Sequence, residues 1–423
     1  MTQRFEIVVA GGGPAGIAAA VCSAECGKKV AILDDNLTLG GQIWRGSNTP
    51  PKGAVYWYKR MAALNITRIH GARIFAQPAP EILRAEQNGG CIDIGYQKLI
   101  LATGARERFL PFPGWTLPNV LGAGALQALV KSGLSVQGKR IVVGGSGPLL
   151  LAVAAHLRKH GARVLAVCEQ ASFSRLLIFA ISVVTDKEKL WQALKYKSRT
   201  LDVPFHASCW PVSAQGDGKL ESITLRKGNR TWIIPCDYLA CGFHLVPNTE
   251  LAELLNCRIL QSGVEVDDLQ QTSIANIYCA GEPTGVGGVE LALVEGQIAG
   301  YGSAGHRQKA SSLFPDRARL RRFAQKLELT FALTPALRSL PLDDTLICRC
   351  EDVPYRALTN EASWRAAKLL TRCGMGPCQG RICGTAAEFL FGWKADSVRP
   401  PIFPATLSSL GATPGLTELQ ETK

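Results

Sequence analysis

Several patterns that mark common protein classes are missing from this 423-residue chain. The N-terminus has no positively charged stretch and no small-residue cleavage site, so we expect no signal peptide. No Cys-x-x-Cys pair occurs, which argues against dithiol redox chemistry of that type. A nucleophile elbow, Ser-His-Asp spacing and paired carboxylates are also missing, and the six histidines share no motif. The sequence therefore predicts no catalytic residue of its own.

Charge and hydrophobicity exclude further classes. Hydrophobic residues make up 47% of the chain and charged residues 19%, which excludes a disordered protein and suffices for about three domains. The formal net charge of +13 is compatible with nucleic acid, but no helix-turn-helix or basic-aromatic pattern supports that partner. Residues 7–24 carry no charge and approach the length of a membrane span, yet three glycines and a proline interrupt them. We expect neither nucleic-acid binding nor a membrane span.

Glycine is abundant, and its first cluster follows a short hydrophobic strand at residues 6–10. The motif Gly11-Gly12-Gly13-Pro14-Ala15-Gly16 then leads into a helix of small apolar residues. This G-x-G-x-x-G pattern between a strand and a helix is typical of dinucleotide binding. We expect Gly11 to form the turn, Gly13 to admit a pyrophosphate and Gly16 to allow close helix–strand packing. The free amides at the helix N-terminus would attract the phosphates.

Further segments narrow the dinucleotide to a flavin. A strand at residues 29–33 ends at Asp34, which is placed to bind ribose hydroxyls. Two later strands, at residues 98–104 and 277–282, end in Ala-Thr-Gly and Gly-Glu. With these segments and a Gly-Gly-Gln turn at residues 40–42, the chain resembles the glutathione and thioredoxin reductase superfamily. The resemblance implies FAD bound by Gly11, Gly13, Pro14, Ala15, Gly16, Asp34, Gly41, Gln42, Ala102, Thr103, Gly104, Gly281 and Glu282.

A second glycine motif near residue 140 is an altered copy of the first. When the prolines are aligned, Gly145 and Gly147 match the first two glycines, but Leu150 replaces the third. The superfamily uses this second domain for NAD(P)H. The sequence leaves three alternatives for it here, which are NAD, ATP or a scaffold without nucleotide.

The acid that should follow this second motif is displaced. Cys168 stands at the position that Asp34 has in the first copy, and Glu169 comes one residue later. We expect Glu169 to bind a ribose only if the strand register shifts by one residue.

Fourteen cysteines in a chain with no export signal argue against a disulfide framework. Nine are scattered, and we expect them to be small buried hydrophobes. The C-terminal region holds the other five, Cys348, Cys350, Cys373, Cys378 and Cys383. Iron–sulfur clusters require four thiolates, which a Cys-x-Cys pair and a Cys-x4-Cys pair could supply. Zinc is the competing metal, but zinc sites favour Cys-x2-4-Cys spacing, so we favour iron–sulfur.

The residues around these cysteines are specific. Arg-Cys-Glu-Asp-Val and Thr-Arg-Cys-Gly-Met-Gly-Pro-Cys-Gln-Gly-Arg-Ile-Cys resemble the bacterioferritin-associated-ferredoxin-like [2Fe-2S] domain. The resemblance implies the ligands Cys348, Cys350, Cys378 and Cys383, with Cys373 as a spare. A set that uses Cys373 together with Cys378 is the alternative. We also expect Gly374 and Gly376 to let backbone amides turn toward the sulfurs.

The chain as a whole resembles the α subunit of bacterial dye-linked amino-acid dehydrogenases and opine oxidases. This group includes D-hydroxyproline and L-proline dehydrogenases, octopine or nopaline oxidase and hydrogen cyanide synthase. The likeness includes a Gly-Phe-x-x-x-Pro-Asn-Thr-Glu-Leu stretch at residues 242–251. It implies an oxidoreductase subunit that acts on CH–NH donors and relays electrons from the FAD of a β subunit, through FAD or FMN and a [2Fe-2S] cluster, to an acceptor.

The resemblance also implies partners. These are a β-subunit flavoprotein of the amino-acid oxidase class, a respiratory-chain or dye acceptor and a small ferredoxin-like γ subunit, with FMN at a subunit interface. A stand-alone NAD(P)H-dependent flavin and iron–sulfur reductase is the alternative function. A sensor or handler of iron–sulfur clusters with a vestigial flavin site is a third. We expect a cytoplasmic protein, or one held peripherally at the inner face of the bacterial membrane.

The predicted fold class is α/β. It has two Rossmann-like dinucleotide-binding domains of the glutathione and thioredoxin reductase type, followed by a small helical [2Fe-2S] domain. A Gly- and Ser-rich segment at residues 300–315 resembles a linker, and a basic helix is expected at residues 317–329. The expected domains are 1–108 and 268–325 for FAD, 109–267 for the second dinucleotide domain, 343–398 for the cluster domain and 399–423 for an irregular tail.

Overall fold

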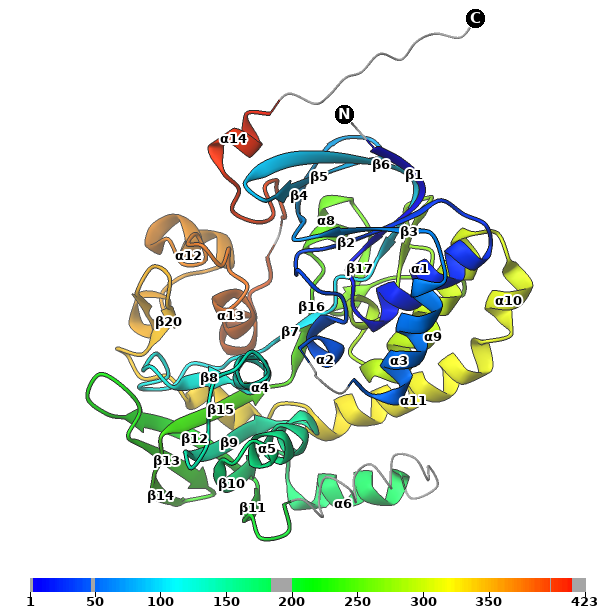
Figure 1. The fold of residues 1–423 in the computed structure, drawn as a ribbon. Helices are drawn as coiled ribbons and strands as arrows, with labels where there is room; N and C mark the ends of the chain where they lie inside the picture. Colours follow the sequence, from blue (N-terminus) through cyan, green and yellow to red (C-terminus); the bar gives the residue numbers. More distant parts are fainter. Residues whose placement is uncertain (1–2, 47–49, 184–199, 396, 413–423) are drawn as a thin grey trace, which may run out of the picture. The chain divides into compact units, whose positions relative to one another are not determined.

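A computed structural model describes residues 3–46, 50–183, 200–395 and 397–412 (Figure 1). The chain divides into two compact units, each built from separate stretches of sequence. The first unit comprises Met1–Arg106, Pro247–Ala324 and Ser397–Lys423, and the second comprises Glu107–Val246 and Gln325–Asp396. The chain therefore passes between the units four times. The first two passages lie in β7 (Ala105–Glu107) and β16 (Leu245–Pro247), which pair with each other.

The first unit is built on a seven-stranded sheet in the order β3-β2-β1-β6-β5-β4, with β19 paired to β6. Neighbouring strands among β3, β2, β1, β6 and β19 run parallel, whereas β4 and β5 are antiparallel to their neighbours. The predicted strands of this unit are present. The strand bounds are β1 (Gln3–Ala10), β2 (Val30–Asp34), β3 (Ile66–His70), β4 (Arg73–Ala79), β5 (Ile82–Gln87), β6 (Gly90–Leu101) and β19 (Ile277–Cys279), with a small pair formed by β17 (Ile259–Leu260) and β18 (Gly263–Val264).

Helix α1 (Pro14–Glu25) packs closely against α9 (Gly288–Ser303) in the first unit. Small residues allow this approach, because a Cβ atom on Gly296 would lie 2.2 Å from the Ala15 carbonyl oxygen and one on Gly300 would lie 2.6 Å from that of Ala19. The other helices of this unit are α2 (Gly41–Trp44), α3 (Lys52–Ala62), α8 (Glu250–Leu254), η1 (Glu282–Thr284), α10 (Arg307–Ser311), α11 (Phe314–Phe331, which continues into the second unit) and α14 (Leu407–Leu410).

The predicted linker at residues 300–315 is wrong. Its first residues complete α9, and α10 and the start of α11 follow. The glycine content reflected the close contact of Gly300 with α1, not a flexible connection. The expected basic helix at residues 317–329 is present within α11.

The second unit repeats the Rossmann pattern with a five-stranded parallel sheet in the order β11-β10-β9-β15-β8. A three-stranded antiparallel sheet, β12-β13-β14, accompanies it. The elements of this part are β8 (Val120–Gly122), α4 (Ala123–Lys131), β9 (Arg140–Ser146), α5 (Leu149–Lys159), β10 (Arg163–Glu169), α6 (Phe173–Val183), β11 (Phe205–Ala207), β12 (Cys209–Gln215), β13 (Ser222–Lys227), β14 (Arg230–Pro235) and β15 (Tyr238–Phe243).

The C-terminal part of the second unit carries the crowded cysteines. Its elements are η2 (Pro335–Ser339), β20 (Leu346–Cys348), β21 (Val353–Pro354), η3 (Tyr355–Ala357), α12 (Trp364–Thr371) and α13 (Cys383–Phe391). Its small core is formed by Ile347, Leu358, Trp364, Ala367 and cysteines. A hydrogen bond of 2.6 Å from Trp115 Nε1 to the Leu346 carbonyl links this part to the rest of the unit. The predicted α/β class, with two Rossmann-like sheets and a small C-terminal helical part, is confirmed.

The unit boundaries differ from the expected domain boundaries in two places. Residues 247–267, expected in the second dinucleotide domain, lie in the first unit because Leu251, Ala252 and Leu255 pack in its hydrophobic core. The tail, expected to be irregular, includes α14, and its Ile402 amide donates to the Phe75 carbonyl at 2.9 Å. Residues 413–423 of that tail lie outside the described residues.

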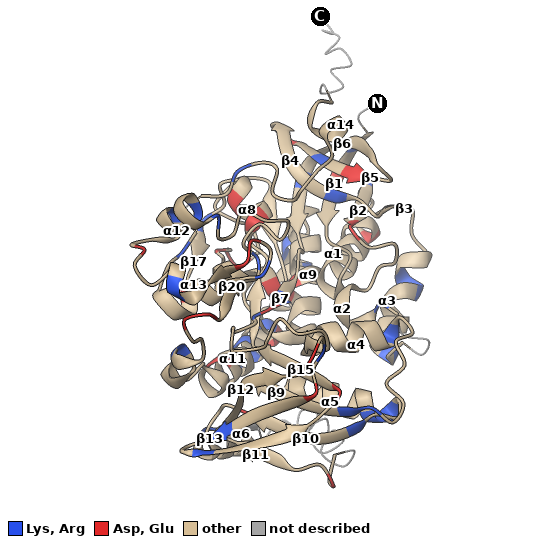
Figure 2. Ribbon diagram, turned by 90° about the vertical axis from the view of Figure 1, so that its left-hand side faces the viewer, with Lys and Arg blue, Asp and Glu red and all other residues tan. Residues whose placement is uncertain are grey.

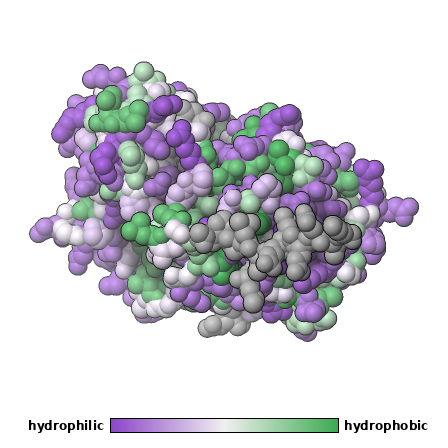
Figure 3. Space-filling view, turned by 90° about the horizontal axis from the view of Figure 1, so that it is seen from above, coloured by the Kyte–Doolittle hydropathy of each residue, from purple (hydrophilic) through white to green (hydrophobic). Residues whose placement is uncertain are grey.

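Charge and hydrophobicity are dispersed over the surface. In the view of Figure 2, Lys and Arg are distributed over several elements, including α3 and α12, with acidic residues between them. In the view of Figure 3, hydrophobic residues form separate small patches among hydrophilic ones. Among the described residues, no helix combines the length and apolar character needed to cross a membrane.

Candidate functional site

The first glycine turn brings β1, β6 and α1 within van der Waals distance. Gly11 has φ +113°, and its amide donates to the Leu33 carbonyl at 2.8 Å. A Cβ atom on Gly11 would lie 2.2 Å from the Ala102 carbonyl oxygen, and one on Gly16 would lie 1.9 Å from the Gly11 carbonyl oxygen. Only glycine fits at these two positions, as the motif predicts.

Gly13 is different because space lies beside it. The nearest atom to a Cβ placed there would be the Gly41 Cα, 4.0 Å away. Helix α1 begins directly after Gly13 with Pro14 in its first turn and has no side-chain cap. Its first amides therefore remain available to phosphate oxygens, which suits a pyrophosphate.

Asp34 lies at the end of β2, beside the same turn. One carboxylate oxygen accepts the Gly12 amide at 2.5 Å, and the other accepts the backbone and side-chain nitrogens of Asn36 at 2.7 Å. These bonds hold the predicted ribose-binding acid in place at the edge of the glycine turn.

The Gly-Gly-Gln segment also reaches the glycine turn. The Gly40 amide donates to the Gly12 carbonyl at 2.7 Å, and Gly41 approaches Gly13 so closely that an added Cβ would lie 3.1 Å from its Cα. Gln42 follows in α2 and accepts a hydrogen bond from Arg45 at 3.2 Å. This segment therefore forms a second wall around the start of α1.

The Ala102-Thr103-Gly104 segment is fixed by Asn248. Thr103 Oγ1 donates to the Asn248 carbonyl at 2.7 Å, and Asn248 Nδ2 donates back to the Thr103 carbonyl at 2.9 Å. The Asn248 amide donates to the Gly104 carbonyl at 3.0 Å, and Arg106 donates to Asn248 Oδ1 at 2.8 Å. This explains the Pro-Asn-Thr-Glu-Leu stretch, whose asparagine locks the strand end beside the glycine turn.

Gly281 and Glu282 complete the site from the end of β19. A Cβ on Gly281 would lie 2.8 Å from that of Ala15, so this turn lies against the start of α1. Glu282 Oε1 accepts the Gly288 amide at 2.9 Å, while its buried Oε2 has no hydrogen-bond partner among the described residues. Burial raises the pKa of Glu282 to about 7. An orphaned buried oxygen beside a dinucleotide turn suits a ligand hydroxyl.

Sequence reasoning missed a charged pair that supports this turn. Glu295 on α9 is fully buried, and it accepts the Gly281 amide at 3.1 Å and Thr284 Oγ1 at 2.8 Å. Arg321 on α11 binds the other Glu295 oxygen at 2.8 Å. An acid within an otherwise apolar helix was the available signal. Glu295 and Arg321 thus act as positioning residues for Gly281 and Glu282.

Replacing Arg321 with alanine should loosen the Gly281 turn. The buried Glu295 carboxylate would lose its charged partner, so we expect a destabilisation of about 1–3 kcal/mol and weaker FAD retention. The adjacent, exposed Arg322→Ala variant is the control. Urea unfolding and FAD content after gel filtration measure both effects. Equal behaviour of the two variants would contradict the positioning role.

The second glycine turn keeps the backbone shape but not the helix contact. Gly145 has φ +133°, and a Cβ there would lie 1.9 Å from the Gly242 carbonyl oxygen. Gly147 has φ +109° and open space on its Cβ side. Leu150, in place of the third glycine, is buried in the core beneath α5. This turn has room for a ligand at Gly147, but α5 packs on its strand through a leucine.

Glu169, not Cys168, occupies the position equivalent to Asp34, which corrects the sequence alignment. In β1 and β2, Ala10 pairs with Leu33, and in β9 and β10 the equivalent Gly144 pairs with Cys168. The register shifts between Val164 and Ala166, so an irregularity at this point supplies the required one-residue shift. Cys168 instead lies in the hydrophobic core.

Glu169 is satisfied by its own turn. Its carboxylate accepts the Gly147 amide at 2.7 Å and the Ala171 amide at 2.8 Å. The side chain is 2% exposed, and burial raises its pKa to about 7. Both oxygens are thus engaged with the backbone while the carboxyl is close to neutral.

The Glu169 pKa predicts a pH-dependent stability. Below pH 4.5 the carboxyl is protonated in the folded and unfolded states, whereas above pH 7 it is ionised in both and the cost of the buried charge is complete. We expect Glu169 to lower the free energy of unfolding by about 2–3 kcal/mol as the pH rises between these values. Glu169→Gln should remove this part of the pH dependence in urea unfolding, and the exposed Glu221→Gln should not. Parallel pH profiles for both variants would contradict the assignment.

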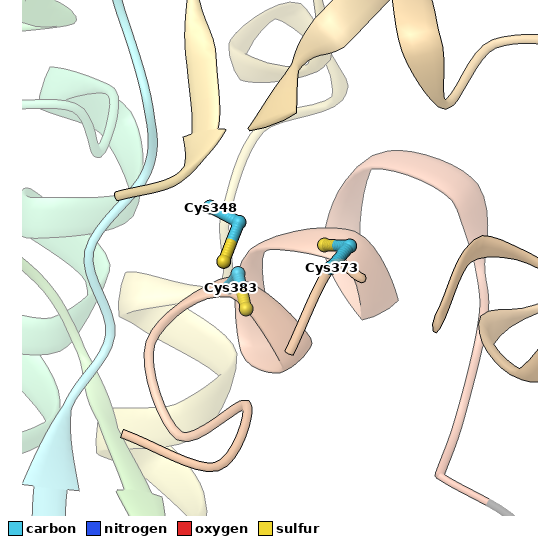
Figure 4. Close-up of side chains that lie close together, drawn as sticks. All are labelled: Cys348, Cys373 and Cys383. Carbon is cyan, nitrogen blue, oxygen red and sulfur yellow. The ribbon is translucent and has the colours of Figure 1, made fainter. Parts of the chain in front are cut away.

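The C-terminal cysteines form a buried group of sulfurs. The Sγ atoms of Cys348, Cys373 and Cys383 all lie within 4.8 Å of one another, and all three residues are buried. Figure 4 shows Cys348 and Cys383 side chains directed toward each other, with the Cys373 sulfur turned toward them. They come from the end of β20, the loop after α12 and the start of α13. Hydrogen bonds from Cys373 and Cys383 lower the pKa of Cys348 to about 2, while the same contact raises the pKa of Cys373 to about 12.

The two remaining cysteines adjoin this triad. The Cys378 sulfur contacts that of Cys383, which lowers the Cys378 pKa to about 5, and it also contacts Cys350. Cys350 is exposed. The structure thus gathers all four residues of the expected ligand set, and it also brings in Cys373, which the sequence treated as a spare.

Backbone amides point at the sulfurs, as the glycine-rich loop predicts. Gly374 and Glu351 donate to Cys348, and Gly380 and Ile382 donate to Cys378. Gly374 has φ +81°, and a Cβ there would lie 2.5 Å from the Trp364 ring. Only a glycine can therefore turn its amide inward at this point. Clustered thiols with amide donors suit an iron–sulfur cluster, and the same thiols suit zinc. A bound metal would displace the thiol protons.

Known proteins support this assignment. Hydrogen cyanide synthase subunit HcnB of Pseudomonas aeruginosa is 29% identical over 433 residues, which cover 90% of this chain and 91% of the relative. An opine oxidase subunit of Rhizobium meliloti is 27% identical over 470 residues, which cover 98% of this chain and 88% of the relative.

Solved structures support the fold. L-proline dehydrogenase from P. horikoshii matches 97% of this chain and 81% of its own with a TM-score of 0.67 at 18% identity. Thioredoxin reductase from T. acidophilum matches 72% and 98% with a TM-score of 0.54 at 20% identity.

The profile of the pyridine nucleotide-disulphide oxidoreductase family matches residues 5–299, which include both glycine turns. Membership implies FAD, and the residues around the first turn fit it through the free start of α1, the space at Gly13 and the orphaned oxygen of Glu282. The chain therefore belongs to the pyridine nucleotide-disulphide oxidoreductase family and is an oxidoreductase homologous to HcnB and to the opine oxidase subunit.

Proposed function

We propose that this protein is the electron-relay subunit of a multisubunit flavoprotein dehydrogenase or oxidase for amino acids or opines. One observation carries the proposal, which is that a single chain combines a dinucleotide site in one unit with a five-cysteine site in the other. When bound, a flavin exchanges two electrons and an iron–sulfur cluster exchanges one at a time, so the pair converts between two-electron and one-electron transfer.

The residues of the chain would hold these groups. The start of α1 and the space at Gly13 would receive the FAD pyrophosphate, Asp34 the ribose, and Glu282 a hydroxyl of the flavin chain. Four of the five cysteines would hold a [2Fe-2S] cluster, with Cys348, Cys350, Cys378 and Cys383 as the proposed ligands. Amides of the surrounding loop would raise its potential.

Partners follow from the relatives. Both the hydrogen cyanide synthase protein and the opine oxidase protein are named as subunits, so we propose that a β-subunit flavoprotein oxidises the substrate and that this chain passes the electrons on. A respiratory-chain or dye acceptor and a ferredoxin-like γ subunit complete the proposed assembly, with FMN at the interface with the β subunit. The substrate pocket would then belong to the partner.

A stand-alone NAD(P)H reductase is the second candidate. It is favoured by Glu169, which the strand register places where the first unit has Asp34. Leu150 beneath α5 and the engagement of both Glu169 oxygens count against it. NAD or ATP bound at Gly147 without hydride transfer is compatible with the relay proposal.

One experiment separates the two candidates. The chain is purified with its co-expressed partner and alone, its flavins and nucleotides are released and identified by chromatography, and iron and sulfide are measured. FAD with about two irons, FMN only in the complex, and no bleaching of the isolated chain by NADPH are expected for the relay. Rapid bleaching of the isolated chain by NADPH would contradict the relay and support the reductase.

A further inference from the structure

The cysteine site contains one thiol more than a two-iron cluster requires. Such a cluster takes four cysteine ligands, whereas five sulfurs meet here. The surplus residue is Cys373 when the four proposed ligands are set aside. An additional cysteine could be an ordinary core residue, so its surroundings decide what it can do.

The surroundings of Cys373 are sulfur atoms as well as hydrocarbon. Its side chain is fully buried next to Trp364 and Ala367 in the small core, yet its Sγ lies within 4.8 Å of the Sγ atoms of both Cys348 and Cys383. Arg372, with φ +64°, and Gly374, with φ +81°, flank it and turn the chain toward the site. Cys373 is therefore held at ligand distance from two proposed ligands without being one of them.

Cys350 has the opposite character. It is an exposed cysteine, and its sulfur contacts Cys378 and not the buried triad. A Cβ on Gly376 would lie 2.4 Å from the Cβ of Cys350, so the glycine-rich loop leaves just enough room for this side chain. Among the proposed ligands, Cys350 is thus the most open to solvent and to oxidants.

We propose that Cys373 is a reserve ligand that replaces Cys350 when Cys350 leaves the cluster. In this exchange one iron–sulfur bond to Cys350 breaks and one to Cys373 forms. The proton of the Cys373 thiol is released as Cys373 binds, and it can protonate the departing Cys350 thiolate, so the oxidation state of iron does not change. The resulting set, Cys348, Cys373, Cys378 and Cys383, lies deeper in the protein. This inference rests on the proposed function insofar as it requires the cluster.

Alanine variants of the full chain test the exchange. The Cys373→Ala variant should keep about two irons and the wild-type electron paramagnetic resonance (EPR) spectrum, because Cys373 is not a ligand at rest. Cys350→Ala should also keep about two irons but with shifted g-values, since one ligand has changed. The double variant Cys350→Ala/Cys373→Ala should fall to near zero. Cys91→Ala, a partly buried thiol in the first unit, is the control, and FAD content and circular dichroism report folding.

Three results would overturn the proposal. If Cys350→Ala is as empty of iron as the double variant while FAD and folding are retained, Cys373 does not substitute. If Cys373→Ala loses the cluster and Cys350→Ala keeps the wild-type spectrum, then Cys373 is a permanent ligand and no exchange occurs. A wild-type protein without iron and sulfide would contradict the relay function as well, which distinguishes that failure from the first two.

Discussion

Replacing both Cys348 and Cys383 with alanine should remove essentially all iron from the protein. Only three cysteines, Cys350, Cys373 and Cys378, would remain at the site, fewer than the four that a cluster needs. The two replaced residues are also the buried centre of the group, since each lies within 4.8 Å of the other and of Cys373. We expect iron and sulfide to fall from about two per chain to near zero.

The flavin provides the internal reference for this variant. The FAD residues belong to the first unit and the cysteines to the second, so FAD should stay bound in equal amount to the protein. Metal analysis, visible absorption and EPR give the cluster content, and Cys91→Ala is again the control. A variant that retains its cluster would contradict the cysteine site as the metal centre. Zinc in the wild-type protein, lost from the variant, would replace iron–sulfur with the competing assignment.

The second large effect separates two glycines only three residues apart. Gly13→Ala should leave the fold intact, because a Cβ there has no atom closer than 4.0 Å, but it should fill the space left for the pyrophosphate. We expect FAD affinity to fall at least about tenfold, a loss of about 1.4 kcal/mol of binding free energy. Fluorescence titration of the apoprotein with FAD measures this change.

Gly16→Ala should fail for a different reason. Its Cβ would lie 1.9 Å from the Gly11 carbonyl oxygen, so α1 would have to move away from β1. We expect a destabilisation of about 1–3 kcal/mol or more in urea unfolding. If Gly13→Ala were the less stable variant and Gly16→Ala bound FAD normally, the assigned roles of the two glycines would be wrong.

The sequence was sufficient for the features that depend on local chemistry. Gly11 and Gly16 are dictated by backbone approach within a few residues, and the strands around them follow from their hydrophobic runs. The crowding of cysteines was likewise visible as spacing. These features are therefore recognisable in the chain without any knowledge of its packing.

Other features depend on packing between distant segments. The register shift that places Glu169 beside the second turn arises from one irregularity in β10, which no residue type announces. The support of Gly281 by Glu295 and Arg321 joins α9 and α11, whose contact is set by the folded unit. The inclusion of Cys373 among the sulfurs depends on how the loop after α12 turns.

The four passages of the chain between the units have a consequence for synthesis on the ribosome. The central sheet of the first unit lacks β19 until residue 279 has emerged, and residues that close its far side, such as Ile402, appear near the end of translation. The second unit likewise awaits its C-terminal cysteines, so neither unit can be completed while the other is still unmade. The nascent chain would expose apolar strands for most of its translation, which favours chaperone engagement and late insertion of the cofactors.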